Sequence, residues 1–188
     1  MANKSVLVPL AQGCEELEAV TIIDLLRRAG IDVVSAGLDD QPVRASRGTV
    51  LVPDTTMDKV MAQDFDMLVL PGGLPGADHL RDDARVQTKL RQMAQQDKYT
   101  AAICAAPKAL ASAGLLDGRR ATSYPGALEG SPAEDLTYLN DPVVIDGKVV
   151  TSRGPGTAMD FALILIELLL GKEARDKVEG PLQRVKNS

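Results

Sequence analysis

The residue with the strongest chemical character in this chain is Cys104, in the stretch "TAAICAAPKAL". A β-prone run ends at this cysteine and a helix-like run follows directly, which predicts a tight strand-to-helix turn of the kind that presents nucleophiles. Such a turn needs small neighbours, and Ala105 and Ala106 come next. A helix N-terminus would stabilise the thiolate and lower the thiol pKa. Because free cysteines are also commonly buried as small apolar residues, the local sequence supports both roles equally.

The second cysteine, Cys14, is in a different setting. It opens a helix-like run in "QGCEE", directly before Glu15 and Glu16. Neighbouring negative charges oppose formation of a thiolate. We therefore expect Cys14 to be structural.

A pair of glycines has the properties of an oxyanion-binding loop. Gly72 and Gly73 follow an apolar run in "VLPGGLPGA", and glycine permits a backbone turned so that N–H groups point inward. Together with the amide of Ala105, these groups would bind a developing oxyanion. This interpretation requires the strand before the glycines to lie near the strand before Cys104.

The candidate proton carriers are one histidine and three acids. His79 is in the polar segment "GADHLRDD", which we expect to be a loop, where a histidine is more often solvated than catalytic. Glu15, Glu16 and Glu18 begin the first helix, and Glu15 and Glu18 roughly share a face. Since acids in a first turn also complement the helix dipole, periodicity leaves the choice among the three open.

Composition limits the class of protein. The 188 residues, 45% of them hydrophobic, suit a single domain spanning 1–188. Aromatic residues make up 3% and the net charge is −5, so no specific nucleic-acid partner is expected. The most apolar segment, "FALILIELLL", is about half a bilayer span and contains Glu167, so no membrane partner is expected either. The short N-terminal apolar run and the two distant cysteines predict a reducing, cytoplasmic location.

An alternation of strand-like and helix-like runs must position these residues. Strands are expected at 5–10, 31–37, 65–73, 99–104, 119–125 and, as a hairpin turning at Asp146-Gly147, at 142–152. Helices are expected at 14–30, 85–96, 105–114, 156–171 and 172–180, and an antiparallel excursion at 42–54. This alternation predicts an α/β fold with a mostly parallel sheet and helices on both faces. Ligands of such sheets bind beyond the carboxyl ends of the strands, where "AQGCEE", "PGG", "ICAAP" and "TSRGPG" all fall.

Four segments in order resemble one known family. "AQGCEELEAVTIIDLLRRAGIDV", "VLPGGLPGA", "AAICAAPKAL" and "TSRGPGTAMDFAL" are similar to the ThiJ/PfpI superfamily, and more narrowly to its DJ-one branch, the Parkinsonism-associated protein deglycases and their bacterial relatives. The closing "GKEARDKVEGPLQ" resembles the extra C-terminal helix of that branch. The resemblance implies a flavodoxin-like three-layer α/β sandwich that forms a homodimer.

The resemblance also implies roles for individual residues. The reactive cysteine of the family falls on Cys104, and its protonated partner glutamate falls on Glu18. A neutral carboxyl can donate a hydrogen bond to a thiolate, whereas an ionised one would repel it. The oxyanion-binding amides of the family map onto Gly73 and Ala105.

Anion-binding arginines of the family correspond to Arg47, Arg28 or Arg153, each of which could equally form a surface ion pair. One departure concerns Tyr124 in "ATSYPGA", where many relatives have a histidine before a proline. A phenol with a pKa near 10 is a poor general base at neutral pH, which weakens an amidase or protease interpretation.

Two main functional interpretations follow from the resemblance. One is glyoxalase- or deglycase-type chemistry on small reactive dicarbonyls or on glycated protein or nucleotide adducts, with no cofactor and no metal. The other is a redox-sensing or chaperone-like stress protein whose cysteine is oxidised to sulfinic acid. Both use Cys104 and Glu18, so the sequence alone leaves both open.

Overall fold

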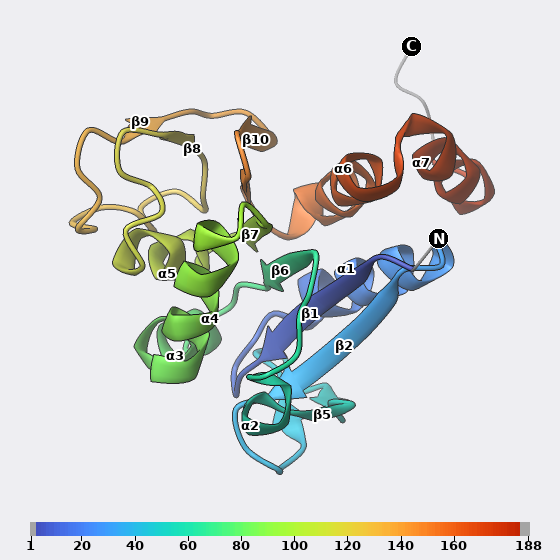
Figure 1. Cartoon of the computed structure of the whole chain (residues 1–188), viewed down its shortest axis with the longest axis horizontal. Helices are drawn as coiled ribbons and strands as arrows, with labels where there is room; N and C mark the ends of the chain where they lie inside the picture. The colour runs from blue at the N-terminus through green and yellow to red at the C-terminus, as the bar shows by residue number, and fades with distance from the viewer. Residues whose placement is uncertain (1–2, 185–188) are drawn as a thin grey trace.

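A seven-stranded sheet forms the centre of the computed structural model, which describes residues 3–184 (Figure 1). In spatial order the strands are β10 (Val143–Asp146), β11 (Val149–Ser152), β7 (Tyr99–Ile103), β6 (Met67–Leu70), β1 (Ser5–Leu10), β2 (Asp32–Gly37) and β5 (Thr55–Thr56). All neighbouring pairs in this sheet are parallel except β10 with β11. The predicted mostly parallel sheet and its antiparallel hairpin are confirmed. The predicted domain range, 1–188, includes end residues that lie outside the described part of the chain.

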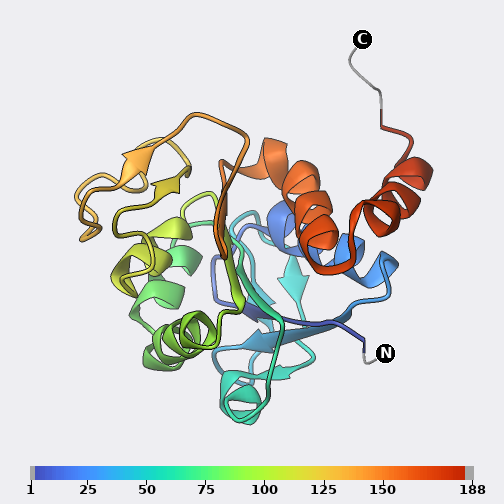
Figure 2. The same ribbon diagram turned by 45° about the horizontal axis from the view of Figure 1, so that its top comes forward.

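Helices cover the two faces of the sheet, as predicted. One face carries α1 (Glu16–Arg28), α6 (Ala158–Leu170) and α7 (Lys172–Glu179). The other carries α2 (Met57–Val60), α3 (Gly76–Asp82), α4 (Ala84–Gln95) and α5 (Pro107–Ser112). Figure 2 shows α6 lying beside α1, in agreement with the packing between these two helices. Among residues 3–184, no helix is both long and apolar enough to cross a membrane.

The sequence of α1 explains how this helix begins and which face it buries. Glu15 caps the helix, and its Oε2 accepts the N–H of Glu18 at 2.8 Å. The inward face is apolar and packs toward the sheet and α6 through Ala19, Ile22, Leu25 and Leu26. Glu18 precedes Ile22 by four positions, so it lies on the same buried face. The helix therefore places one carboxyl group in the interior, close to the carboxyl end of β1.

Two segments differ from the prediction. His79 is on helix α3 and not in a loop, because Ala77 and Leu80 supply a small buried face that the surrounding polar residues hide in the sequence. Helix α5 begins at Pro107 and has six residues, so a turn through Ala105 and Ala106 separates it from the strand. The dipole of so short a helix is correspondingly weak at the thiol.

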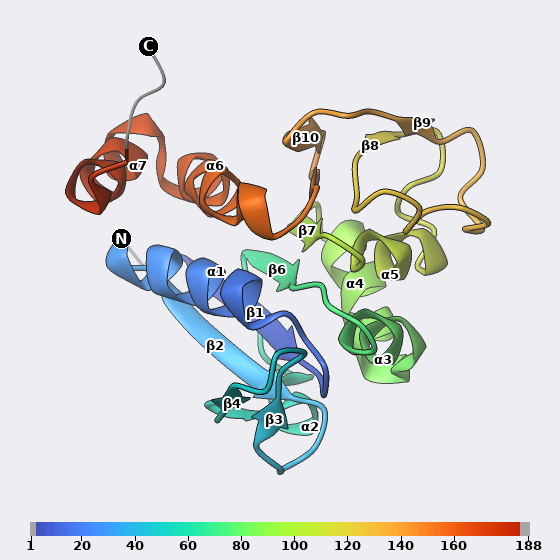
Figure 3. The same cartoon turned by 180° about the vertical axis from the view of Figure 1, so that it is seen from behind.

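Two small sheets lie outside the main one. The predicted antiparallel excursion is confirmed as β3 (Val43–Arg44) paired with β4 (Val50–Leu51), visible in Figure 3 below β2. The expected strand at 119–125 is shorter, since β8 covers Arg120–Ala121 and pairs in parallel with β9 (Thr137–Tyr138). The segment between β8 and β9 forms an irregular lobe beside α5, at the upper left of Figure 1.

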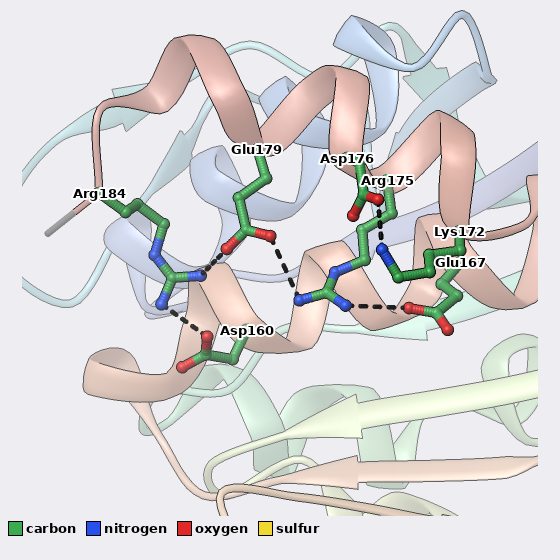
Figure 4. A network of polar contacts seen from close by, with 7 residues as sticks. All are labelled: Asp160, Glu167, Lys172, Arg175, Asp176, Glu179 and Arg184. Atoms are coloured by element: carbon green, nitrogen blue, oxygen red, sulfur yellow. Dashed lines mark hydrogen bonds and ion pairs between the residues drawn. The ribbon is translucent and has the colours of Figure 1, made fainter. Parts of the chain in front are cut away.

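A network of ion pairs links the C-terminal helix α7 and the residues after it to α6 (Figure 4). Val178 is the buried residue of α7. Arg175 bridges Glu167 of α6 and Glu179 of α7, at 3.2 Å each. Arg184 extends the network to Asp160 at 2.6 Å and to Glu179 at 3.1 Å. The predicted last helix is thus confirmed, and both ion pairs and apolar packing join it to α6.

Candidate active site

Cys104 occupies the strand-to-helix turn at the carboxyl end of β7. Its φ angle is +63°, a left-handed conformation that non-glycine residues rarely adopt. Its N–H donates to the carbonyl of Ser152 at 3.0 Å, and its carbonyl accepts the N–H of Tyr124 at 2.8 Å. The backbone of the cysteine is therefore fixed from two neighbouring segments, and the residue is 8% exposed.

The two glycines after β6 have different tasks. The N–H groups of Gly73 and Ala105 act on the Cys104 sulfur and lower the pKa of its thiol. The N–H of Gly72 instead donates to Oε2 of Glu18 at 2.8 Å. The prediction that Gly72 contributes to the oxyanion pocket is therefore wrong, because its donor is already used by the carboxyl group. Gly73 with Ala105 remains the pair of amides at the sulfur.

Close packing explains why both positions are glycine. A Cβ at Gly72 would lie 2.6 Å from Cβ of Cys104 and 2.8 Å from Oε2 of Glu18, which no side chain tolerates. Gly73 has a φ of +89°, which favours glycine. The loop after β6 thus presses directly against the cysteine and the glutamate.

Glu18 is the acid that lies beside the thiol. It is fully buried, and its Oε1 is without a hydrogen-bond partner of normal geometry among the described residues. Burial raises the pKa of Glu18 to about 7, with a further contribution from the charge of Glu15, while the Gly72 N–H and the Cys104 thiol act in the opposite direction. The carboxyl group is consequently poised to carry a proton near neutral pH.

The other two acids of the helix start have structural tasks. Glu15 caps α1, as described above, and its own N–H donates to the carbonyl of Gly72 at 2.9 Å. Glu16 accepts the N–H groups of Arg47 at 3.0 Å and Thr49 at 3.3 Å, so it holds the turn between β3 and β4. The structure thereby separates three acids that periodicity left equivalent.

The pKa of the thiol differs from the prediction. Burial, followed by the negative charge of Glu18, raises the pKa of Cys104 to about 12, while the N–H groups of Gly73 and Ala105 lower it. The prediction that the helix N-terminus by itself produces a low pKa is therefore wrong. A thiolate at neutral pH requires the proton to reside on Glu18, because a neutral carboxyl removes the opposing charge and can donate to the sulfur.

Cys14 and His79 are both separate from this pair. Cys14 is fully buried, and burial followed by the charges of Glu16 and Glu15 raises its pKa to about 12, which confirms that it is structural. His79 is exposed on α3 and lines a different hollow, next to Gln12 and Asp83. No cysteine–histidine pair is formed among residues 3–184, consistent with the expectation that His79 is solvated.

One of the three arginine candidates is far from the site. Arg28 lies ten positions after Glu18 on α1, which is about 15 Å along the helix axis. It pairs with Asp24 at 2.6 Å. Within one chain it occupies the end of α1 opposite to Glu18, so its predicted anion-binding role is not one at the Cys104 of the same chain.

The other two arginines lie closer to the site. Arg153 bonds to another loop, and Arg47 is exposed. Arg153 follows β11 directly, and its guanidinium donates to the backbone and side-chain oxygens of Asn140 at 3.1 and 3.3 Å. Arg47 is exposed in the turn that Glu16 holds near the start of α1. Neither role as an anion-binding residue is decided by these contacts.

A cavity of 520 Å³ opens beside the cysteine. Its wall includes Ala105, the Tyr124 side chain, Lys108 of α5 and Arg81 of α3, together with residues from 125–132. Tyr124 is 54% exposed and its backbone bonds to Cys104, so it stands at the junction of site and cavity. Sequence reasoning missed Lys108, which lies in the first turn of α5, the helix that follows the Cys104 turn.

The described residues offer no metal site. Between residues 3 and 184, no group of three or more histidine, cysteine, aspartate or glutamate side chains is arranged to hold a metal ion. The site itself brings together a thiol, a buried carboxyl group and two backbone N–H donors.

Comparison with known proteins identifies relatives over nearly the whole chain. The DJ-1/PfpI family model matches residues 4–168. "Protein DJ-1 homolog A" of Arabidopsis thaliana is 44% identical over 96% of this chain, and the chain spans 46% of that longer relative. The "Glutathione-independent glyoxalase DJR-1.2" of Caenorhabditis elegans is 35% identical over 96% of this chain and 97% of its own length. The crystal structure of Drosophila melanogaster DJ-1beta superimposes with a TM-score of 0.93 at 42% identity, covering 98% of this chain and 100% of that one.

Proposed function

The chain belongs to the DJ-1/PfpI family, and from this premise we propose that it is a cysteine-dependent stress-protection protein with glyoxalase- or deglycase-type activity. Its substrates would be small reactive dicarbonyls or glycated protein or nucleotide adducts. The observation that supports this best is the buried pair of Cys104 and Glu18 beneath the amides of Gly73 and Ala105. The glyoxalase name of one relative points in the same direction.

The proposed chemistry begins with proton transfer within the pair. With the proton on Glu18, the Cys104 thiolate adds to the aldehyde carbon of a dicarbonyl, and the N–H groups of Gly73 and Ala105 bind the resulting alkoxide. Glu18 donates its proton to that oxygen, and its carboxylate then removes the proton from the former aldehyde carbon to give an enediolate. Transfer of the hydroxyl proton to the neighbouring oxygen, and return of the proton held by Glu18 to the adjacent carbon, leave a thioester of the cysteine. Water hydrolyses the thioester, releasing a 2-hydroxy acid and the thiol.

Product formation from methylglyoxal tests this proposal. We expect the purified protein to convert methylglyoxal to lactate at a rate above that of buffer alone. Cys104→Ala should reduce the rate to the buffer value, because the covalent intermediate cannot form. Cys14→Ala should retain activity, since Cys14 is a fully buried packing residue that takes no part in the covalent step. Loss of methylglyoxal without an equal amount of lactate would count against an enzymatic role.

A redox-sensing role is a second candidate that the same geometry supports. Once oxidation to sulfinic acid has occurred, the low exposure of Cys104, 8%, and the N–H groups of Gly73 and Ala105 would protect the product from further oxidation. A chaperone-like role has no separate structural support. Both cysteines are free thiols, which fits the reducing cytoplasm that we propose as the location.

We also propose that two copies of the chain form a C₂ dimer through α1. Leu17 and Val20 are 51% and 47% exposed on the outer face of this helix, and exposed apolar patches of this kind mark interaction surfaces. We expect the parent protein to sediment as a dimer at micromolar concentration and Val20→Glu to sediment as a monomer. Ile145→Glu, on β10, introduces the same charge at another exposed apolar position and should leave the dimer intact. A monomeric parent would contradict the proposal.

A further inference from the structure

Lys108 is a cationic side chain on the wall of the cavity beside the cysteine. It lies in the first turn of α5, four residues after Cys104, and lines the same 520 Å³ cavity as Ala105. The N–H of Ala105 acts on the Cys104 sulfur, so Ala105 connects the reacting centre to the cavity. A molecule bonded to the sulfur and extending past Ala105 would enter the cavity that Lys108 lines.

The Lys108 ammonium is held in place by a carboxylate that it shares. Its Nζ contacts Oδ1 of Asp78 at 2.9 Å, and Arg81 contacts the same oxygen at 3.1 Å. The Lys108 side chain is 18% exposed, so its position is well restricted. An ammonium group has three N–H donors, and among residues 3–184 Asp78 is the acceptor recorded for it, which leaves two donors for a ligand or water.

The two cationic side chains on the cavity wall differ in how many carboxylate partners they have. One carboxylate, Asp78, serves both Lys108 and Arg81, while Arg81 is also bound by Asp82 at 2.7 Å. Arg81 is thereby occupied on two sides, and Lys108 retains the spare donors. The acidic residue of the wall, Glu129, is exposed on the 125–132 segment and has no recorded bond to Lys108 within the described range.

We propose that Lys108, positioned by Asp78, is a subsite for a carboxylate on the carbonyl substrate that reacts at Cys104. This inference rests on the proposed function and specifies its substrate class. The size of the cavity supports it, because 520 Å³ lies within the range of small-molecule sites and greatly exceeds what a three-carbon dicarbonyl fills. A ketoaldehyde with a carboxylate at its far end would place the reactive carbonyl at the thiol and the negative charge at Lys108.

Alkylation of Cys104 with a charged and a neutral reagent tests the subsite without requiring turnover. Iodoacetate and iodoacetamide deliver nearly the same group to a thiolate, but only iodoacetate carries a carboxylate. We expect Lys108→Met to lower the ratio of the iodoacetate rate to the iodoacetamide rate by about three- to tenfold, as a nearby charge in a partly buried site would. Mass spectrometry of the Cys104 peptide measures both rates, so alkylation elsewhere does not interfere.

Two variants serve as controls for this measurement. Lys108→Arg keeps the charge and should leave the ratio within about twofold of the parent, given comparable Coulomb attraction. Lys59→Met removes the same charge from an exposed position on α2 and should leave the ratio unchanged. The iodoacetamide rate is an internal reference, because distortion of the strand-to-helix turn at Cys104 would change it as well. An unchanged ratio in Lys108→Met, or an equal fall in both rates, would overturn the proposal.

Turnover gives a second and separate readout. Methylglyoxal and 4,5-dioxopentanoate share the ketoaldehyde group, but only the second carries a carboxylate. Lys108→Met should raise the ratio of the KM for 4,5-dioxopentanoate to the KM for methylglyoxal, relative to the same ratio in the parent. Absence of turnover with both substrates would count against the proposed function, while the alkylation ratio would still decide whether Lys108 binds anions.

Discussion

Gly72→Ala should abolish most of the activity at Cys104 through the displacement of two side chains at once. The added methyl group would lie 2.6 Å from Cβ of Cys104, 2.8 Å from Oε2 of Glu18 and 2.8 Å from the carbonyl oxygen of Ile103. None of these atoms is the end of a flexible side chain on the protein surface, so the cysteine and the glutamate must separate. We expect the rate of lactate formation to fall by roughly 100-fold, the scale of loss for a displacement of about 1 Å in a reacting group.

The same substitution should also reduce stability. Overpacking of a filled interior typically costs about 1–3 kcal/mol, which urea unfolding can measure. Gly180→Ala is the matched control, because a methyl group there meets no atom within 4 Å and the backbone is not in the left-handed region. A Gly72→Ala protein with parental activity would show that the separation of Cys104 and Glu18 is unimportant, and the proposed proton transfer between them would have to be abandoned.

The fold was largely predictable because its main signals are local. The apolar runs at β1, β6 and β7 are short and separated by helical periodicity, which favours parallel strands with helical connections. The Asp146-Gly147 turn signal is local too, and it marks the antiparallel hairpin of the main sheet. Helix α3 was missed since its buried face consists of little more than Ala77 and Leu80 within a polar segment. Such a helix depends on packing against neighbours that the local sequence does not display.

The composition of the site was predictable to a smaller degree. The position of Cys104 at a strand end follows from the sequence, as does the presence of glycines after β6. The division of tasks between Gly72 and Gly73 depends on the direction of each N–H, which is a property of the folded loop. The raised pKa of Cys104 has burial as its main cause, and burial is a tertiary property. A helix-dipole argument could not anticipate it.

Substitution of Glu18 should raise the pH at which the Cys104 thiolate appears. If Glu18 carries the proton, its Oε1, which lacks a partner among the described residues, donates a hydrogen bond to the thiolate. Glu18→Leu removes this donor and retains the bulk, whereas Glu18→Gln retains a weaker N–H donor. We therefore expect the thiol pKa to be lowest in the parent, intermediate in Gln and highest in Leu. A charge-assisted hydrogen bond of roughly 1.5–3 kcal/mol corresponds to about one to two pKa units between parent and Leu.

The ultraviolet absorbance of the thiolate follows this titration, with Cys104→Ser as the blank. Glu15→Gln and Glu16→Gln control for general loss of charge at the start of α1. Loss of the Glu18 donor should also make sulfinic acid less persistent, with oxidation proceeding to sulfonic acid in the Leu variant.

The pH dependence of stability gives an independent test of the protonation of Glu18. Burial raises its pKa from 4.5 to about 7 in the folded protein. Between these values the folded state binds more protons than the unfolded chain, so the free energy of unfolding falls as pH rises through this window. Glu18→Gln cannot ionise and should flatten this part of the stability curve. Urea unfolding at a series of pH values measures the difference between the two proteins.

An ionised Glu18 predicts the opposite result in the thiol titration. Its negative charge is the second cause that raises the pKa of Cys104 to about 12, so removing it in Glu18→Leu would then lower the thiol pKa. The two protonation states of the pair thus predict shifts of opposite sign for one substitution. A lowered thiol pKa in Glu18→Leu would show that the proton resides on the sulfur. The carboxyl group would then be a base that must first receive the thiol proton, and addition of Cys104 to a carbonyl would require that transfer in every turnover.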